Sequence, residues 1–289
     1  MPLTWLKHIK TMRYASKMGS FFPSLQHPKQ APLGTSEMET VGSWWKRLNQ
    51  EIYWFRCSQH RVPFPNIQKP IRIAHLTDLH VQGQSPWLDS LCQFISTVKA
   101  DIVVYTGDVI AHGWTHAAVD QLFRHSPKGR LGTFAIMGNW EHWSKAKPDV
   151  WRPLLHQYGV QLLVEEHVSF GEFGIVGTDD HLAGTSSPDD WNLPDIPHIA
   201  LSHSPAFFPT LCRDPIHLVL SGHAHGGQVR VPFLKAVWAP RGTEHYVSGW
   251  FQKDHRHLFV SRGLGCSVAP LRFRCPPEMA YIDLIPTRR

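Results

Sequence analysis

The sequence lacks the cysteine patterns that staple small secreted domains or bind structural zinc. Its 289 residues include five cysteines, at positions 57, 92, 212, 266 and 275, and none of them stands in a CxxC pair. An odd, scattered set argues against a disulfide framework and against a cysteine-ligated zinc site. It favours a reducing compartment instead.

Long apolar runs and the composition of a secretory signal are also missing. No run approaches the roughly 18 apolar residues that a membrane-spanning helix needs. The N-terminus shows no apolar core followed by a small-residue cleavage site. We therefore expect a cytoplasmic protein without a membrane span.

Acidic residues are absent from the first 36 positions, which carry five basic residues: Lys7, Lys10, Arg13, Lys17 and Lys29. Such a segment is attracted to anionic surfaces, either lipid head groups or nucleic acid. A solvated basic tail is the alternative. Because Gly, Pro, Ser and Gln interrupt every periodic stretch, residues 1–42 are expected to form a basic, poorly ordered leader.

An amphipathic helix is predicted over residues 43–60, with Ser43 as its N-cap. Its apolar residues recur at helical spacing on one face: Trp44, Trp45, Leu48, Ile52 and Phe55. This face could pack on the rest of the chain. It could also lie in a membrane interface, where tryptophan is favoured, which would place the protein peripherally on the inner face of the membrane.

Strands and helices alternate from residue 71 onwards. The pattern predicts strands at 71–77, 101–106 and 131–137, with helices at 86–99 and 115–125 between them. Further strand-like runs follow at 160–164, 173–178, 198–202, 216–220, 257–261 and 279–285. Residues 61–289 are therefore expected to form one α/β domain, a layered sandwich in which helices flank two sheets.

Polar side chains follow five of these strands in a fixed order. They are Asp78, His80, Asp108, Asn139, His203, His223 and His225. Ligands bind beyond the carboxyl ends of parallel strands, so these side chains are expected to converge. Oxygen and imidazole donors without sulfur suit Mn, Fe, Zn or Mg ions. Chance would require five unrelated coincidences, so the pattern favours a metal centre.

The ordered motifs DLH, GD, GN, SH and GHAH resemble those of the calcineurin-like metallophosphoesterases, over about residues 60–285. The resemblance implies a four-layer α/β/β/α sandwich of two mixed sheets, the metallophosphoesterase fold. It implies two divalent metal ions, Mn first and Fe, Zn or Mg as alternatives. It also implies that a metal-bridging hydroxide attacks phosphorus. One ion would be held by Asp78, His80, Asp108 and His225, and the other by Asp108, Asn139, His203 and His223.

Two further motifs, GHAHGGQ and SRGLG…RCPPE (residues 261–278), are similar to those of a bacterial branch of the family. That branch includes enzymes acting on nucleotide-linked lipids such as UDP-2,3-diacylglucosamine. Arg241, Arg262 and Arg272 are predicted to be surface charges, with steadying an anionic substrate as the alternative.

One departure from the family pattern concerns the general acid. The family usually reads GNH before an acidic residue, whereas this chain reads GNWEHW, with Trp140 in the histidine's place. Indole cannot give up a proton at useful pH. His142 is the candidate replacement and His112 a second one; both could instead be ordinary loop histidines. Trp140 is a candidate for substrate contact.

General acid catalysis is worth roughly 10²–10⁴-fold and matters most for poor leaving groups. The departure therefore favours a phosphoanhydride or phosphodiester over a simple alkyl phosphate. The leading hypothesis is a metal-dependent hydrolase of a nucleotide-linked lipid, working at an anionic membrane surface. The alternatives are a soluble phosphodiesterase for nucleotides or nucleic acid, and an inactive metal-binding scaffold. No specific nucleic-acid or protein partner is inferred.

Overall fold

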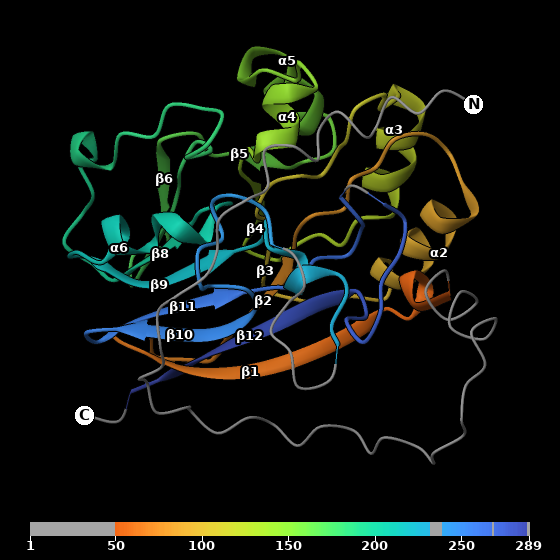
Figure 1. Ribbon diagram of the computed structural model, residues 1–289. Coiled ribbons are helices and arrows are strands. Elements are labelled where there is room, and N and C mark those ends of the chain that lie inside the picture. Colours follow the sequence, from red (N-terminus) through yellow and green to blue (C-terminus); the bar gives the residue numbers. More distant parts are fainter. Residues whose placement is uncertain (1–49, 232–238, 268, 288–289) are drawn as a thin grey trace. The chain divides into compact units, whose positions relative to one another are not determined.

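The protein is described by a computed structural model that covers residues 50–231, 239–267 and 269–287. Two six-stranded sheets dominate the fold (Figure 1). Each strand and helix predicted from residue 71 onwards is present, whereas the helices at 139–143, 148–156 and 208–211 and the strands at 166–169 and 249–253 were not predicted. Among the described residues, no helix has the length and hydrophobicity to span a bilayer.

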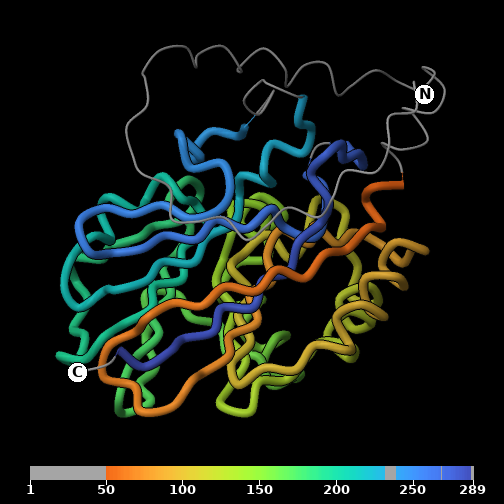
Figure 2. The backbone as a smooth tube through the Cα atoms, turned by 90° about the horizontal axis from the view of Figure 1, so that it is seen from below, coloured from red at the N-terminus to blue at the C-terminus, as the bar shows by residue number. Residues whose placement is uncertain are grey.

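The first sheet has the strand order β1-β12-β2-β3-β4-β5. All neighbours are parallel except β12 and β2, which run antiparallel. In Figure 2, β1 and β12 cross the molecule side by side, in agreement with their nine-residue register. The strands are β1 Arg56–Phe64, β2 Ile71–Leu76, β3 Ile102–Tyr105, β4 Gly132–Ala135, β5 Gln161–Leu162 and β12 Glu278–Pro286.

Three helices cover the outer face of this sheet: α2 Pro86–Ile95, α3 His116–His125 and α5 Pro148–His156. Helix α2 begins where Ser85 accepts the N–H of Leu88 at 3.2 Å and Pro86 supplies a preset φ. Its buried side chains Leu88, Leu91 and Ile95 belong to the same core cluster as the outward-facing side chains of β3 and β4.

The second sheet has the order β10-β11-β9-β8-β7-β6 and is parallel in its middle, from β11 to β7. Its strands are β6 Glu166–Ser169, β7 Gly174–Gly177, β8 His198–Leu201, β9 Ile216–Ser221, β10 Gly249–Lys253 and β11 Arg256–Val260. A thinner layer covers its outer face, built on η4 Pro205–Phe207 and α6 Phe208–Leu211. The turn η3 Pro188–Asp190 precedes β8.

A hydrophobic core fills the space between the two sheets. Ile73, Val104 and Phe134 from the first sheet pack in one buried cluster with Ile199 and Leu220 from the second. Strands buried on both faces read as continuous apolar runs, which is why periodicity located them. The layers are thus helix, sheet, sheet and helix, so the predicted four-layer α/β/β/α sandwich of two mixed sheets is confirmed.

The start of the described chain differs from the predicted helix over 43–60. Residues 43–49 and the predicted leader 1–42 lie outside the described residues. The described chain begins at Gln50, which is helical, and continues through the 3₁₀ turn η2 Glu51–Tyr53. Strand β1 begins at Arg56, so the helix prediction is wrong for residues 56–60. The proposed boundary at residue 61 falls inside β1. The reason is long-range: residues 56–64 pair with β12 along their whole length and bury Val62 and Phe64.

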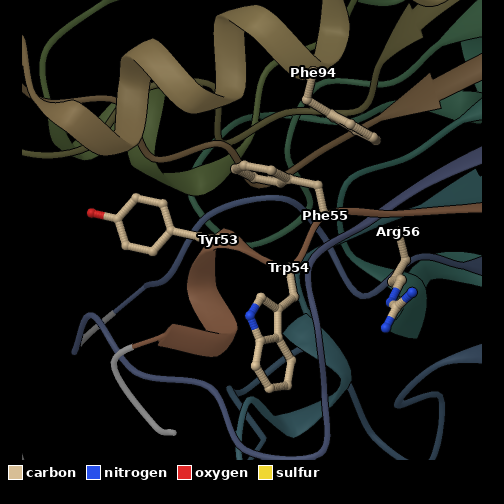
Figure 3. A pocket seen from close by; sticks show the side chains of 5 residues that line it. All are labelled: Tyr53, Trp54, Phe55, Arg56 and Phe94. Atoms are coloured by element: carbon tan, nitrogen blue, oxygen red, sulfur yellow. The ribbon is translucent and has the colours of Figure 1, made fainter. Parts of the chain in front are cut away.

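Between η2 and β1, the aromatic side chains divide between the interior and the surface (Figure 3). Phe55 stacks on Phe94 of α2 at a centroid distance of 5.1 Å. Tyr53 and Trp54 point away from the helix and are each 42% exposed. Together with Arg56 they line a shallow pocket.

Candidate metal centre

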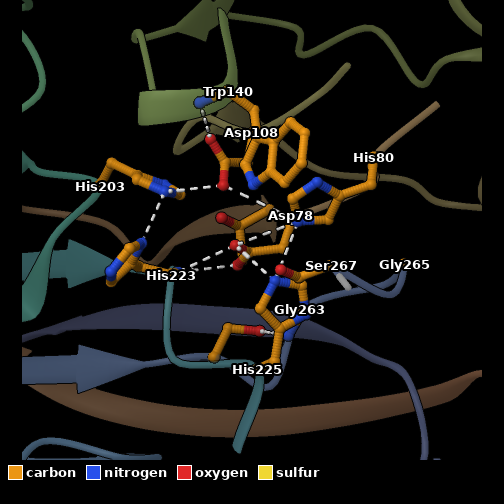
Figure 4. Close-up of polar contacts among 12 residues, drawn as sticks. Asp78, His80, Asp108, Trp140, His203, His223, His225, Gly263, Gly265 and Ser267 are labelled. Carbon is orange, nitrogen blue, oxygen red and sulfur yellow. Dashed lines mark hydrogen bonds and ion pairs between the residues drawn. The ribbon is translucent and has the colours of Figure 1, made fainter. Parts of the chain in front are cut away.

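The loops after β2, β3, β4, β8 and β9 bring the seven predicted residues together, and Figure 4 labels six of them, all but Asn139. All seven side chains are buried: Asp78, His80, Asp108, Asn139, His203, His223 and His225. The loops are tied by backbone hydrogen bonds, from Asp78 N–H to Gly107 O at 3.1 Å and from His80 N–H to Asp108 O at 3.0 Å. The predicted convergence is therefore present in the structure.

Left-handed backbone recurs at this site. Positive φ values between 50° and 68° occur at five of the seven residues: Asp78, His80, Asp108, His223 and His225. This region is uncommon for residues other than glycine, and such strain concentrates at functional sites. The fold therefore holds these side chains in positions that local preference would not choose.

One group of donors consists of Asp78, His80 and His225, called here the first cluster. The Nε2 atom of His225 lies 3.3 Å from Asp78 Oδ1 and 2.9 Å from His80 Nε2. The Nε2 atom of His80 lies 4.0 Å from the same Asp78 oxygen. Three ligand-type atoms thus face one small volume.

The second cluster consists of Asp108, His203 and His223, with Asn139 beside it. His203 Nε2 lies 3.1 Å from Asp108 Oδ2, 3.2 Å from His223 Nδ1 and 3.2 Å from Asn139 Oδ1. This group supplies two imidazoles, a carboxylate and an amide oxygen to one volume.

The two histidines of the second cluster are oriented by backbone carbonyls on their far sides. His203 Nδ1 lies 2.8 Å from Thr106 O, and His223 Nε2 lies 2.6 Å from Arg241 O. If each of these nitrogens carries the proton and donates to the carbonyl, the inward nitrogen keeps its lone pair. Metal-binding histidines are typically held in this way.

Asp108 joins the two clusters. Its Oδ2 atom lies 3.1 Å from His203 Nε2 in the second cluster and 3.7 Å from His80 Nε2 in the first. A single carboxylate that faces both groups can neutralise charge between two cations.

Burial sets the protonation of the centre. Desolvation raises the pKa of Asp78 to about 7 and that of Asp108 to about 6. Desolvation also lowers the pKa of His223 to about 3 and holds those of His80 and His225 well below the ordinary value, which keeps these imidazoles neutral. For His203, burial is outweighed by Asp108 and nearby carboxylates, which raise its pKa. Buried carboxylates beside neutral imidazoles call for cations, so the donor set fits divalent metal ions.

Glu141 is a structural residue of the centre that the sequence reasoning did not assign. It lies in the one-turn helix α4 Asn139–Trp143 and is 0% exposed. Its carboxylate accepts the N–H groups of Gly138, Asp108, Val109 and Ile110 at 2.7–3.2 Å. The acidic residue after Asn139 was the available signal, but only the folded chain shows what it binds.

Trp140 and His142 lie on the same short helix and face different partners. The ring of Trp140 meets that of His80 edge-on at a centroid distance of 5.6 Å, and the backbone N–H of Trp140 donates to Asp108 Oδ1 at 2.8 Å. The Nε2 atom of His142 lies 2.7 Å from Asp179 Oδ1, and this hydrogen bond raises the pKa of His142. His112, the second candidate acid, is exposed.

Comparisons with known proteins agree with this geometry. The family model for calcineurin-like phosphoesterases matches residues 71–227, a range that contains all seven residues. Phosphodiesterase YaeI of Escherichia coli is 30% identical over 245 residues, covering 80% of this chain and 89% of that protein. The metallophosphoesterase YkuE of Bacillus subtilis is 30% identical, covering 81% and 87%. The UDP-2,3-diacylglucosamine pyrophosphatase LpxG of Chlamydia muridarum is 26% identical, covering 73% and 83%.

Proposed function

The chain belongs to the calcineurin-like phosphoesterase family of metal-dependent hydrolases, and from this premise we propose that it cleaves a phosphoanhydride or phosphodiester bond at a dinuclear centre. The position of Asp108 carries the proposal, because its Oδ2 atom faces histidines of both clusters at 3.1 and 3.7 Å. In this proposal Asp108 is shared between two ions. The first ion is held by Asp78, His80, Asp108 and His225, and the second by Asp108, Asn139, His203 and His223.

Two divalent cations at such a centre lower the pKa of water and offset the charge of phosphoryl oxygens. The chain's own contribution is orientation. Thr106 O and Arg241 O fix the rings of His203 and His223, and Glu141 fixes the turn that presents Asp108. We propose manganese as the first metal to test, with iron, zinc and magnesium as alternatives, because all accept oxygen and imidazole donors.

His142 is the proposed general acid. It stands three residues after Asn139, and residues three apart share a face of a helix. Its raised pKa, caused first by the Asp179 hydrogen bond, keeps it protonated to higher pH than an ordinary histidine. Trp140, beside His80, is proposed to line the substrate site. Trp140 stands where the family usually has histidine, so protonation of the leaving group depends on His142 acting from a different position, and we propose that substrates with stable leaving groups are preferred.

A nucleotide-linked lipid such as UDP-2,3-diacylglucosamine is the proposed substrate. The name of the relative LpxG, a UDP-2,3-diacylglucosamine pyrophosphatase, supports this choice. So does the basic composition of residues 1–36, which suits an anionic lipid surface.

The exposed aromatic side chains Tyr53 and Trp54 are the proposed membrane contact among the described residues (Figure 3). They precede Arg56, the first residue of β1, which lies opposite Glu278, the first residue of β12, in the strand register. Because β12 runs antiparallel to β2, the start of β12 lies beside the C-terminal end of β2, which Asp78 follows. Aromatic and basic side chains at these strand ends would orient the metal centre toward the lipid.

The test compares three substrates with manganese-loaded protein: UDP-2,3-diacylglucosamine, bis-p-nitrophenyl phosphate and p-nitrophenyl phosphate. The proposal predicts that the lipid pyrophosphate is cleaved fastest. Turnover of the model diester alone would refute the lipid substrate and favour the soluble phosphodiesterase. No turnover of any substrate would favour the inactive scaffold.

Membrane contact has its own test, sedimentation with anionic liposomes. A Tyr53→Ser/Trp54→Ser variant is expected to bind less than the wild type. Leu131→Ser is the matched control. Leu131 is 37% exposed, but it precedes β4 and so lies at the strand ends opposite the metal centre. Equal binding by all three proteins would contradict the proposed contact.

A further inference from the structure

Two stretches of the described chain flank the first cluster, residues 261–265 (the first arm) and residues 273–278 (the second arm). The first arm lies against Asp78: Leu264 N–H donates to Thr77 O at 3.0 Å, and Gly265 N–H donates to Asp78 O at 2.6 Å. A Cβ atom on Gly263 would stand 2.6 Å from Asp78 Cβ, so this arm touches the residue directly. Figure 4 shows Gly263 and Gly265 beside Asp78.

The second arm lies against His225. Cys275 Sγ is 3.3 Å from His225 O and 3.6 Å from Gly226 O. Gly226 has φ +60°, and a Cβ there would stand 2.7 Å from the same sulfur. The loop that presents His225 is therefore packed against this arm without free space.

Arg272 connects the two arms, and the prediction that it is a surface charge or a substrate contact is wrong, because it is 0% exposed. Its guanidinium donates to Gly265 O, Gly263 O and Arg262 O in the first arm, at 2.5–3.1 Å. It donates to Cys275 O in the second arm at 3.0 Å. All these acceptors are backbone carbonyls.

We infer that Arg272 is a positioning residue for the first metal ion, because one guanidinium ties together the arms that flank Asp78 and His225. The inference rests on the proposed dinuclear centre. The planar fork of five N–H donors can hold several carbonyls at once, whereas a lysine ammonium is a point charge on a flexible stem. Arg272→Lys thus keeps the positive charge but loses the hydrogen bonds that connect the two arms.

The histidine rings of the second cluster have orienting contacts outside these arms. His203 and His223 are oriented by Thr106 O and Arg241 O, which lie outside residues 261–278. Loss of the Arg272 hydrogen bonds should therefore weaken binding of the first ion and leave binding of the second ion largely unchanged.

The experiment titrates metal-free protein with Mn²⁺ and counts bound ions by electron paramagnetic resonance, in which coupled and single ions give different spectra. Wild-type protein should bind two ions. Arg272→Lys should weaken one of them by roughly 10–100-fold, the usual effect of losing support around a ligand, and its spectrum should change from coupled to single ions. Arg256→Lys is the matched control: this arginine is also buried and donates to Ile216 O at 3.0 Å, but it belongs to β11.

Three outcomes are informative. Two ions bound by folded Arg272→Lys with wild-type affinity would overturn the inference. Fewer than two ions in the wild type would instead refute the proposed dinuclear centre. Should Arg272→Lys not fold, Gly263→Ala decides, because its methyl group must displace the first arm from Asp78. That variant should also lose one ion, and unchanged binding of both would again overturn the inference.

Discussion

The carboxylate of Glu141 accepts the backbone N–H of Asp108 at 2.9 Å, in a site from which solvent is excluded. Its two oxygens also accept N–H groups from Val109, Ile110 and Gly138. The hydrogen bonds of Glu141 thus stabilise the turn in which Asp108 adopts φ +52°. Residues next to the motif, as well as the motif itself, determine where the shared carboxylate lies.

Replacing Glu141 by Gln should destabilise the fold. The amide keeps one oxygen but directs an NH₂ group toward backbone donors, so buried N–H groups lose their acceptor. We expect a loss of about 2–3 kcal/mol in the free energy of unfolding, measured with urea. Glu166→Gln is the control, since its ion pair with Arg152 is exposed and should change stability by about 0.5 kcal/mol or less. Equal effects in both variants would contradict this role.

His142→Ala should lower the rate of hydrolysis, and the decrease should be larger for substrates with poorer leaving groups. If His142 protonates the leaving oxygen, hydrolysis of an alkyl phosphodiester falls by roughly 10²–10⁴-fold, while a p-nitrophenyl diester is affected much less. The measurement compares kcat for the two esters in each variant. His112→Ala should leave both rates unchanged, and the reverse pattern would move the acid role to His112.

The ion pair of His142 with Asp179 should also appear in the pH dependence of stability. The pKa of His142 is raised in the folded state, so its contribution is fully present below the unfolded value near 6.5 and is lost as pH rises through the folded value. The pKa of Asp179 is lowered, so the pair weakens again in acid. Urea unfolding of wild type and Asp179→Asn should differ by about 1–2 kcal/mol at pH 6 and by less at pH 9. A difference that grows with pH would contradict the pairing.

Metal removal should lower stability in a pH-dependent way. Mn²⁺ at about 100 times its dissociation constant should add about 2.7 kcal/mol per site to the free energy of unfolding. In the metal-free centre the pKa of Asp78 is about 7 and that of Asp108 about 6, so protons compete with the ion as pH falls below 7. The rise in melting temperature on adding Mn²⁺ should therefore be larger at pH 8 than at pH 5.5. The same rise at both pH values would contradict proton competition.

Local sequence predicted the strands and the donor residues because both depend on short-range patterns. Ile71–Leu76 and Ile216–Ser221 are largely apolar strands that end two residues before Asp78 and His223. Partnerships over long distances were not predictable in the same way. Strand β1 is defined by residues more than 200 positions away in β12. Arg272 has partners only 3–10 residues away along the chain, but they are four backbone carbonyls that converge through an irregular loop conformation. Neither partner leaves a periodic signal near the residue concerned.

The most direct test of the dinuclear hydrolase is hydrolysis of bis-p-nitrophenyl phosphate as Mn²⁺ is added to metal-free protein. The nitrophenolate leaves without a general acid, so the assay reports on the centre alone. We predict no hydrolysis before metal is added, a rise that ends when two ions are bound, and none in Asp108→Ala. Equal hydrolysis by metal-free protein, or by Asp108→Ala loaded with metal, would contradict the account.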